Sequence, residues 1–378
     1  MARLGDIATY INGYAFKPTD WSNEGIPIIR IQDLTGNSYQ ANRFDGEYDP
    51  KYEVNYGDVL ISWSASLGVY VWTGERAVLN QHIFKVSFDK AEIDKSFFVH
   101  QVECILDKAS GEAHGATMKH LTKPIFDALP FFLPNIHEQK RIAQELDQVS
   151  NLIFLRKQQL LKLDELVKSR FIEMFGDLML NQYDWPVVKI SDVSLFLKSG
   201  LSRKLSDKDI GLPVIRSGNI QNGQFLYDDI KYWYKDDPQG SKTGDYILED
   251  GDILVNFINS ASQIGKTAIF RNVGRDCIYT TNIFRMKLAE KCNEYYYNWF
   301  AMSDYYYRQL QNIIQPAVNQ ASFTTVNFLK LDIPLPPLEL QKQFAAFVEQ
   351  IDKSKFEIQK SLEKLETLKK ALMQKYFG

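Results

Sequence analysis

The stretch GIPIIR at residues 25–30 returns as GLPVIR at residues 211–216. Four further matches follow in the same order: GDVLI at 57–61 with GDILV at 251–255, SASLG at 64–68 with SASQIG at 260–265, Asn80 with Asn282, and TKPIFDALPFFLP at 122–134 with TTVNFLKLDIPLP at 324–336. The separation between matched residues grows from 186 at the first stretch to 202 at Asn80 and then stays constant. A period of this length is too long for a solenoid repeat, so it predicts two similar domains in tandem.

Each copy begins with short runs of β-branched and aromatic residues separated by Gly, Asn, Asp and Pro, which is typical of strands joined by turns. IPIIRI and HIFKVSF in the first copy have LPVIR and NIFRMKL as counterparts in the second. A helical stretch follows late in each copy, SFFVHQVECILDK and EYYYNWFAMSDYYYRQL. We therefore expect an α+β fold with two similar domains, each containing a mixed or antiparallel sheet with helices.

Each copy ends in a long segment that has neither glycine nor proline, after Pro134 and after Pro337. Apolar residues recur there at alternating spacings of four and three, the pattern of a coiled-coil seam. The seam positions are Ile142, Leu146, Val149, Ile153, Leu160, Leu163, Val167 and Met174, and the matched positions in the second copy are Phe344, Val348, Ile351, Lys355, Leu362, Leu365, Lys369 and Tyr376. About 40 residues at ~1.5 Å each give a helix roughly 60 Å long. The two helices most simply bury their seams against each other, antiparallel, with some surface left for a partner.

These patterns divide the chain into four parts. We expect a first domain at residues 1–135, a long spacer helix at 136–178, a second domain at 179–336 and a second long spacer helix at 337–378. Two like domains on an antiparallel helix pair would have approximate two-fold symmetry.

Composition restricts the class of protein. The 378 residues are 45% hydrophobic and 24% charged, with a net charge of −3; these are ordinary proportions for a globular protein. No apolar stretch approaches the length of a membrane span, MARLGDIATY does not resemble a secretory signal, and the three cysteines include no CxxC pair. We therefore expect a cytoplasmic protein without membrane contact. Because the balance is not basic, any nucleic-acid-binding face must be local.

Catalytic motifs are mostly absent. SASQIGKT at 260–267 resembles a phosphate-binding loop, but Ser260 stands where the first glycine is needed and the following AIF suggests a strand instead of a helix. The five histidines show no metal-ligand spacing, and we interpret His82 as structural. No GxSxG elbow and no [DNS]PP[FYW] tetrapeptide of adenine methyltransferases occurs. We expect no catalytic site, no metal and no cofactor in this chain.

The two-copy plan resembles the specificity (S) subunits of bacterial type I restriction-modification systems. The resemblance rests on the repeated G-I/L-P-hydrophobic-I-R run, the repeated G-D-hydrophobic-L segment and the junctions LPNIHEQKRIAQELD (133–147) and LPPLELQKQFAAFVEQID (335–352). It implies two target-recognition domains, each reading one half of an asymmetric double-stranded DNA site. It also implies that the long helices dock two adenine methyltransferase subunits, which carry S-adenosylmethionine, while motor-nuclease subunits use ATP and Mg²⁺.

Base-edge readout requires polar side chains on exposed loops, and three groups of loops supply candidates. They are Thr117, Met118, Lys119 and His120, matched by Asn319, Gln320, Ala321 and Ser322; then Ser64 and Ser66, matched by Ser260, Ser262, Gln263 and Lys266; and finally Lys17, with Ser202, Arg203 and Lys204. Residue types differ at every matched position of the first group, which fits domains that read different bases but is equally expected from surface drift. For Arg30 and Arg216, phosphate contact and a structural ion pair both stay open.

Two other functions stay open from the residues alone. The long helices could belong to a scaffold or adaptor protein that does not read bases. SASQIGKT could belong to a nucleotide-using enzyme, in which case Lys266 would contact a phosphate.

Overall fold

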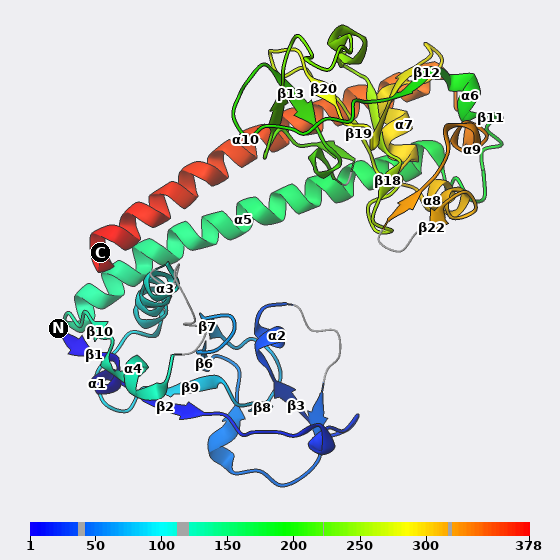
Figure 1. Ribbon diagram of the computed structural model, residues 1–378. Coiled ribbons are helices and arrows are strands. Elements are labelled where there is room, and N and C mark those ends of the chain that lie inside the picture. Colours follow the sequence, from blue (N-terminus) through cyan, green and yellow to red (C-terminus); the bar gives the residue numbers. More distant parts are fainter. Residues whose placement is uncertain (37–41, 112–120, 222, 317–319) are drawn as a thin grey trace. The chain divides into compact units, whose positions relative to one another are not determined.

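The computed structural model describes residues 1–36, 42–111, 121–221, 223–316 and 320–378. The chain divides into two compact units (Figure 1). Unit 1 comprises Met1–Gln158 together with Gln359–Gly378, and unit 2 comprises Gln159–Ile358. Each unit therefore contains one globular domain and one part of each long helix. No helix among these residues is long and apolar enough to cross a membrane.

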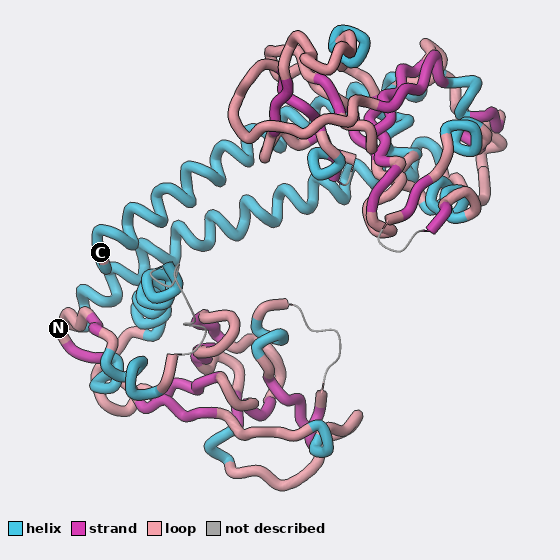
Figure 2. Tube along the Cα trace, in the orientation of Figure 1, coloured by secondary structure: helices cyan, strands magenta, loops and turns pink. Residues whose placement is uncertain are grey.

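The domain of unit 1 has short strands and helices joined by longer loops (Figure 2). Its elements are β1 (Ala2–Arg3), α1 (Leu4–Ile7), β2 (Thr9–Asn12), β3 (Ile26–Ile29), α2 (Ile31–Leu34), β4 (Arg43–Phe44), β5 (Glu53–Val54), β6 (Val59–Ser62), β7 (Gly68–Val71), β8 (Ala77–Leu79), β9 (Ile83–Ser87), α3 (Lys95–Gly111), α4 (Lys123–Ala128) and β10 (Pro130–Phe131).

The domain of unit 2 follows the same plan with additional short strands. Its elements are β11 (Val187–Lys189), α6 (Ile190–Val193), β12 (Ser194–Ser199), β13 (Leu212–Ile215), β14 (Ile220–Gln221), β15 (Gln224–Phe225), β16 (Lys231–Trp233), β17 (Ile253–Asn256), β18 (Ile258–Asn259), β19 (Thr267–Ile269), β20 (Ile278–Tyr279), β21 (Ile283–Leu288), α7 (Glu294–Phe300), α8 (Asp304–Gln311), β22 (Gln315–Pro316), β23 (Ala321–Ser322), α9 (Thr325–Leu329) and β24 (Asp332–Pro334).

The two units share their strand order. An antiparallel sheet with the order β2-β9-β6-β7 in unit 1 corresponds to β12-β21-β17-β19 in unit 2. A second sheet contains one parallel pair in each unit, β3 with β8 and β13 with β20. The pairs β1–β10 and β11–β24 join the start of each domain to its end. These mixed sheets with helices confirm the predicted α+β fold with two similar domains.

The hydrogen-bonding register corrects the sequence match of Asn80 with Asn282. Asn80 and Thr280 form the equivalent parallel bridges in the two units. Asn282 therefore corresponds to His82, and the separation at this point is 200 residues instead of 202. The match from residue letters was wrong because the backbone pairing of neighbouring strands, and not residue identity, determines which positions are equivalent.

The repeated Gly-Asp dipeptide forms the tight turn before the central strands β6 and β17, which are buried at every position. Gly57 and Gly251 have φ values of 88° and 85°, in the left-handed region that favours glycine. The carboxylates of Asp58 and Asp252 each accept a hydrogen bond from the backbone N–H three residues earlier, at 2.9 and 2.6 Å. The motif is therefore part of the framework of the sheet.

The long helices α5 (Ile136–Phe175) and α10 (Leu338–Phe377) run antiparallel. In unit 1, Ile142 near the start of α5 lies in the same core as Tyr376 near the end of α10. In unit 2, the rings of Phe171 near the end of α5 and Phe344 near the start of α10 are 5.4 Å apart. Of the predicted seam residues, Ile142, Leu146, Val149, Val167, Met174, Phe344, Val348, Ile351 and Leu362 are buried. The predicted antiparallel packing is thus confirmed within each unit.

A buried glutamine in the first turn of each long helix ties that helix to its domain. The Oε1 atoms of Gln139 and Gln341 accept hydrogen bonds from the backbone N–H of Asp94 and Asn293, both at 2.8 Å. Each Nε2 donates to two backbone carbonyls at 2.7–3.3 Å. Asp94 and Asn293 lie at the starts of α3 and α7, so one side chain joins two helices in each unit.

Replacing this glutamine should loosen the junction. We expect Gln341→Ala to lower the free energy of unfolding of unit 2 by about 2–4 kcal/mol, because a buried N–H and two carbonyls lose their partner. Urea unfolding followed by fluorescence measures this change. Gln343→Ala, at an exposed position on the same helix, is the matched control and should change stability by less than about 0.5 kcal/mol. Equal effects of the two substitutions would contradict the assignment.

Candidate nucleic-acid interface

Two of the predicted loops in unit 2 meet in one small sheet. Strand β23 pairs with β18, placing Ser322 opposite Ile258, and also with β22. The chain enters the SASQIG loop directly after β18, where Asn259 pairs with Ala321, so the start of this loop and Gln320 follow at the same end of the strand pair. Ser260, Ser262 and Gln320 are exposed, Gln263, Lys266 and Ser322 are half-buried, and Ala321 is buried. The tertiary structure thus joins candidates about 60 residues apart into one polar edge.

Unit 1 has the equivalent junction. The backbone N–H of Leu121 donates to the carbonyl of Trp63 at 3.0 Å, as that of Phe323 donates to Phe257 at 3.3 Å in unit 2. Ser64 directly follows Trp63 and is buried, whereas Ser66 is exposed. Thr117, Met118, Lys119, His120 and Asn319 lie outside the described residues.

The early loops supply exposed side chains from Lys17, Ser202 and Lys204. Arg203 differs from them, because its Nη2 lies 2.6 Å from the carboxylate of Asp237, whose side chain is inaccessible to solvent. This hydrogen bond holds the pKa of Asp237 well below its usual range. Arg203 therefore acts within the loop framework instead of pointing freely to a ligand.

Arg30 and Arg216 also lie beside carboxylates. Arg30 is 3.8 Å from Asp33 and stacks over the ring of Trp21. Arg216 Nη2 lies 2.6 Å from the carboxylate of Asp229. Of the two roles that the sequence left open, this geometry supports the structural ion pair.

The SASQIGKT segment does not have the geometry of a phosphate-binding loop. Its turn closes with a hydrogen bond from the N–H of Gly265 to the carbonyl of Asn256 at 2.7 Å. Thr267 then begins β19, which pairs with β17. Because a strand follows, as predicted, no helix N-terminus faces an anion here. Across the described residues, no group of three or more His, Cys, Asp or Glu could hold a metal ion.

Three side chains that were not predicted to contact DNA, Asn12, Trp63 and His82, lie together in unit 1. The indole Nε1 of Trp63 donates to Oδ1 of Asn12 at 3.1 Å, and the ring of His82 lies edge-on to the indole at 4.9 Å. His82 belongs to the turn before β9 instead of a strand, with φ of 73°. No sequence signal brings these residues together, because the strands that carry them are distant in the chain.

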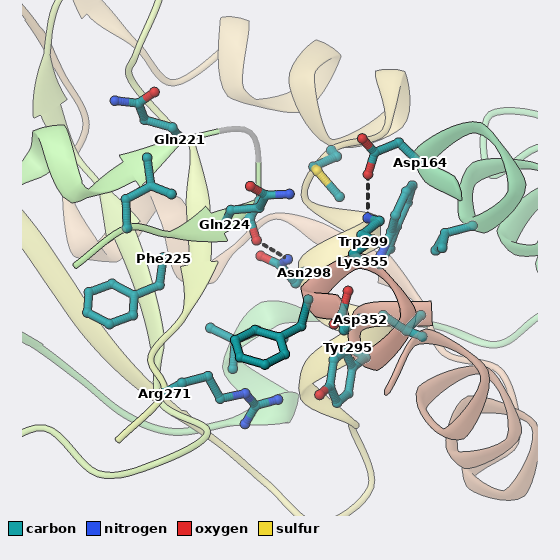
Figure 3. Close-up of a pocket in the computed structure, with 17 residues that line it drawn as sticks. Asp164, Gln221, Gln224, Phe225, Arg271, Tyr295, Asn298, Trp299, Asp352 and Lys355 are labelled. Carbon is teal, nitrogen blue, oxygen red and sulfur yellow. Dashed lines mark hydrogen bonds and ion pairs between the residues drawn. The ribbon is translucent and has the colours of Figure 1, made fainter. Parts of the chain in front are cut away.

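A cavity of about 1020 Å³ in unit 2 lies between α7, the β14–β15 hairpin and parts of the two long helices (Figure 3). Asp164 and Lys355 form an ion pair within its lining, and the guanidinium of Arg271 lies 4.9 Å from the ring centre of Tyr295. Burial raises the pKa of the Asp352 carboxyl. This mixture of aromatic and charged side chains suits contact with another protein chain.

The family model described as the type I restriction modification DNA specificity domain matches residues 1–165 and 182–370. The MjaVIII type I restriction enzyme specificity subunit of Methanocaldococcus jannaschii is 24% identical, over 99% of this chain and 90% of that protein. The EcoBI specificity subunit of Escherichia coli is 22% identical, over 99% of this chain and 84% of that protein.

Two solved structures have the same fold over the whole chain. The S subunit of a type I restriction-modification system from M. genitalium superposes with a TM-score of 0.59 at 13% identity, covering 100% of this chain and 95% of its own. A chain from a study of complex assembly and conformational transition in the type I R-M system has a TM-score of 0.54 at 17% identity, covering 100% and 96%.

The Arg203–Asp237 pair generates a prediction about pH. A folded-state pKa below the unfolded value stabilises the fold above about pH 4, and that stabilisation is lost as the pH falls further. Asp237→Asn should therefore lower stability most at pH 7, and the loss should shrink progressively as the pH falls below about 4 toward the folded-state pKa, as measured by urea unfolding from pH 7 to pH 2. The exposed neighbour Asp236 supplies the control Asp236→Asn, and a pH-independent loss in Asp237→Asn would contradict the charge-based account.

Proposed function

The chain belongs to the family defined by the type I restriction modification DNA specificity domain, and from that premise we propose that it selects the DNA site at which partner enzymes act. Each unit would read one half of a bipartite double-stranded site. The observation that carries this proposal is the same strand order in both units, with matched backbone bonds from Leu121 to Trp63 and from Phe323 to Phe257 beside segments whose residue types differ. Two domains with the same framework but different loop side chains could each bind one half of a DNA site whose two halves differ in sequence.

The long helices would act as the spacer between the half-sites. Both α5 and α10 contribute residues to unit 1 and to unit 2, each as an unbroken helix of 40 residues. Because an α-helix has a constant rise per residue, helix length would set the number of unread base pairs. A longer helix pair should change the spacing without changing the bases that are read.

Exposed apolar side chains on the long helices support two docking sites for one kind of partner. Phe154 of unit 1 and Phe356 of unit 2 occupy matched positions and are 58% and 66% exposed. The ion pairs Lys157–Glu366 and Lys355–Asp164 show which residues of the two helices lie at the same level. By this alignment an exposed leucine of the opposite helix, Leu368 for Phe154 and Leu166 for Phe356, lies within about one helical turn along the axis. Equivalent apolar pairs in both units suit binding of two copies of the same protein.

These partners would be two adenine methyltransferase subunits, with motor-nuclease subunits completing the enzyme in the cytoplasm. S-adenosylmethionine, ATP and Mg²⁺ would bind to the partners, and this chain would be non-catalytic. Family membership does not support the scaffold hypothesis without base readout. No observation in the described structure favours the nucleotide-using enzyme.

The function is tested by expressing the chain with its methyltransferase partner and mapping N6-methyladenine across the host genome. We expect methylation within one bipartite, asymmetric motif. Methylation that is random, or absent although the correctly matched partner is intact, would count against the proposal.

Exchanging one domain tests whether each domain recognises its own half-site independently. Replacement of residues 1–135 by the corresponding domain of another family member should change one half of the methylated motif and leave the other half intact. The same methylation map provides the readout. A change in both halves would show that the domains do not read independently.

Charged substitutions test the docking sites. Phe154→Lys and Phe356→Lys should each reduce the bound methyltransferase from two copies to one, because each removes an apolar contact and adds an unpaired charge. Native mass spectrometry of the complex counts the copies. Tyr56→Lys, at a residue that is 76% exposed on the domain of unit 1, is the control and should leave two copies bound. Two copies bound to the Phe154→Lys, Phe356→Lys double variant would place docking elsewhere.

A further inference from the structure

A tryptophan holds an exposed asparagine at the end of β2. Asn12 is exposed, and its Oδ1 accepts the hydrogen bond from Trp63 Nε1 at 3.1 Å. The indole is held in turn, because it stacks on Phe84 with ring centres 5.7 Å apart, and its backbone N–H donates to the carbonyl of His82 at 3.2 Å. Trp63 therefore has little freedom to move, and its indole N–H is a fixed donor.

This bond determines which way the asparagine amide faces. An indole N–H can only donate, so the amide atom beside it must be the oxygen. Nδ2 then points away from the indole with both of its hydrogens. In the described part of the chain, Nδ2 has no acceptor, and the partner of Asn12, Trp63, directly precedes the SAS segment and accepts the backbone hydrogen bond of Leu121. Asn12 thus presents a pre-oriented donor to solvent.

Unit 2 lacks this arrangement. Ser199 ends β12 at the position equivalent to Asn12, since both residues pair with matched phenylalanines of the neighbouring strand. Phe257 replaces Trp63, and its ring stacks on Phe284 with centres 3.5 Å apart and planes 4° apart. The framework is therefore kept while the oriented amide is specific to unit 1.

We propose that Asn12 determines specificity at one position of the half-site read by unit 1, where it prefers a keto base and above all guanine, and that Trp63 is its positioning residue. This inference rests on the proposed function. In the major groove, guanine presents two acceptors, N7 and O6, to a donor amide, and thymine presents one, O4. Cytosine presents only an exocyclic amino donor, and adenine places its amino donor beside the single acceptor N7, so both face the Nδ2 hydrogens less favourably than guanine does.

Trp63 matters because, without its hydrogen bond, the side-chain amide of Asn12 could rotate freely. An unrestrained amide can rotate and bind adenine through N6 and N7 with its oxygen and nitrogen together. Because the indole keeps Oδ1 turned toward itself, the rotation that would bring this oxygen to N6 breaks the indole hydrogen bond and is disfavoured. Trp63 thereby affects base choice without contacting DNA.

Two variants test the proposal in the complex with the methyltransferase partner, using selection from DNA in which the half-sites are randomised. Asn12→Asp replaces the donor by an acceptor, so the preferred base at one position should change from keto to amino, with binding to the original base weakened on the order of 10-fold. Trp63→Phe introduces the residue that unit 2 carries. It should admit adenine at the same position, reducing the preference for guanine over adenine about 10-fold.

The controls separate base readout from folding. Thermal unfolding and binding to non-specific DNA should be unchanged in Trp63→Phe, and Ser199→Asp should leave the half-site read by unit 1 as it was. A wild-type half-site with no keto preference at any position, or an Asn12→Asp variant that weakens all sequences alike, would overturn the inference. A wild-type complex with no sequence preference at all would instead overturn the proposed function.

Discussion

The structure depends on the hydrogen bonds that join each long helix to its domain. A helix of 40 residues can position a domain only if its connection to that domain is stiff, and the chain following a proline turn is not stiff by itself. Gln139 and Gln341 make this connection in the same way. Each amide satisfies a backbone N–H and a carbonyl at the start of a neighbouring helix, and one carbonyl just before its own helix. Both side chains are buried, so the bonds do not compete with water.

Beside this shared junction, the two units differ in the side-chain contacts that join α3 in unit 1, and α7 in unit 2, to the long helices. In unit 1, the buried His100 bonds to Asp147 of α5 at 2.8 Å. In unit 2, Trp299 of α7 packs against both Phe171 of α5 and Phe344 of α10, with its ring centre 6.0 and 6.1 Å from theirs. Backbone geometry is thus retained while the side chains diverge, as expected where a fold is duplicated and only its framework is constrained.

Base readout makes the opposite demand on the loops, where side chains must differ and must also be held in place. The candidate interface meets this demand by joining each loop to the sheet through backbone bonds, so that side chains can change without loss of the framework. The ion pairs of Arg203, Arg30 and Arg216 serve the same purpose of holding the loops in place. Their ion pairs with carboxylates stiffen the loops, and the charge that would have suggested DNA contact is neutralised locally.

The sequence by itself determined the duplication, the α+β class and the two antiparallel helices, because strand periodicity, heptad spacing and a long repeat are local or self-matching patterns. At Asn282 its letters supported two conflicting pairings, with Asn80 by residue identity and with His82 through the runs HIFKVSF and NIFRMKL, and the strand register decides for His82 because it is set by hydrogen bonds between distant segments. The sequence could not show that Trp63 orients Asn12, or that Arg203 forms an ion pair with Asp237. Such contacts depend on which loops the folded sheets bring together. Only the tertiary structure decided which polar residues are held as part of the framework and which are presented to a ligand.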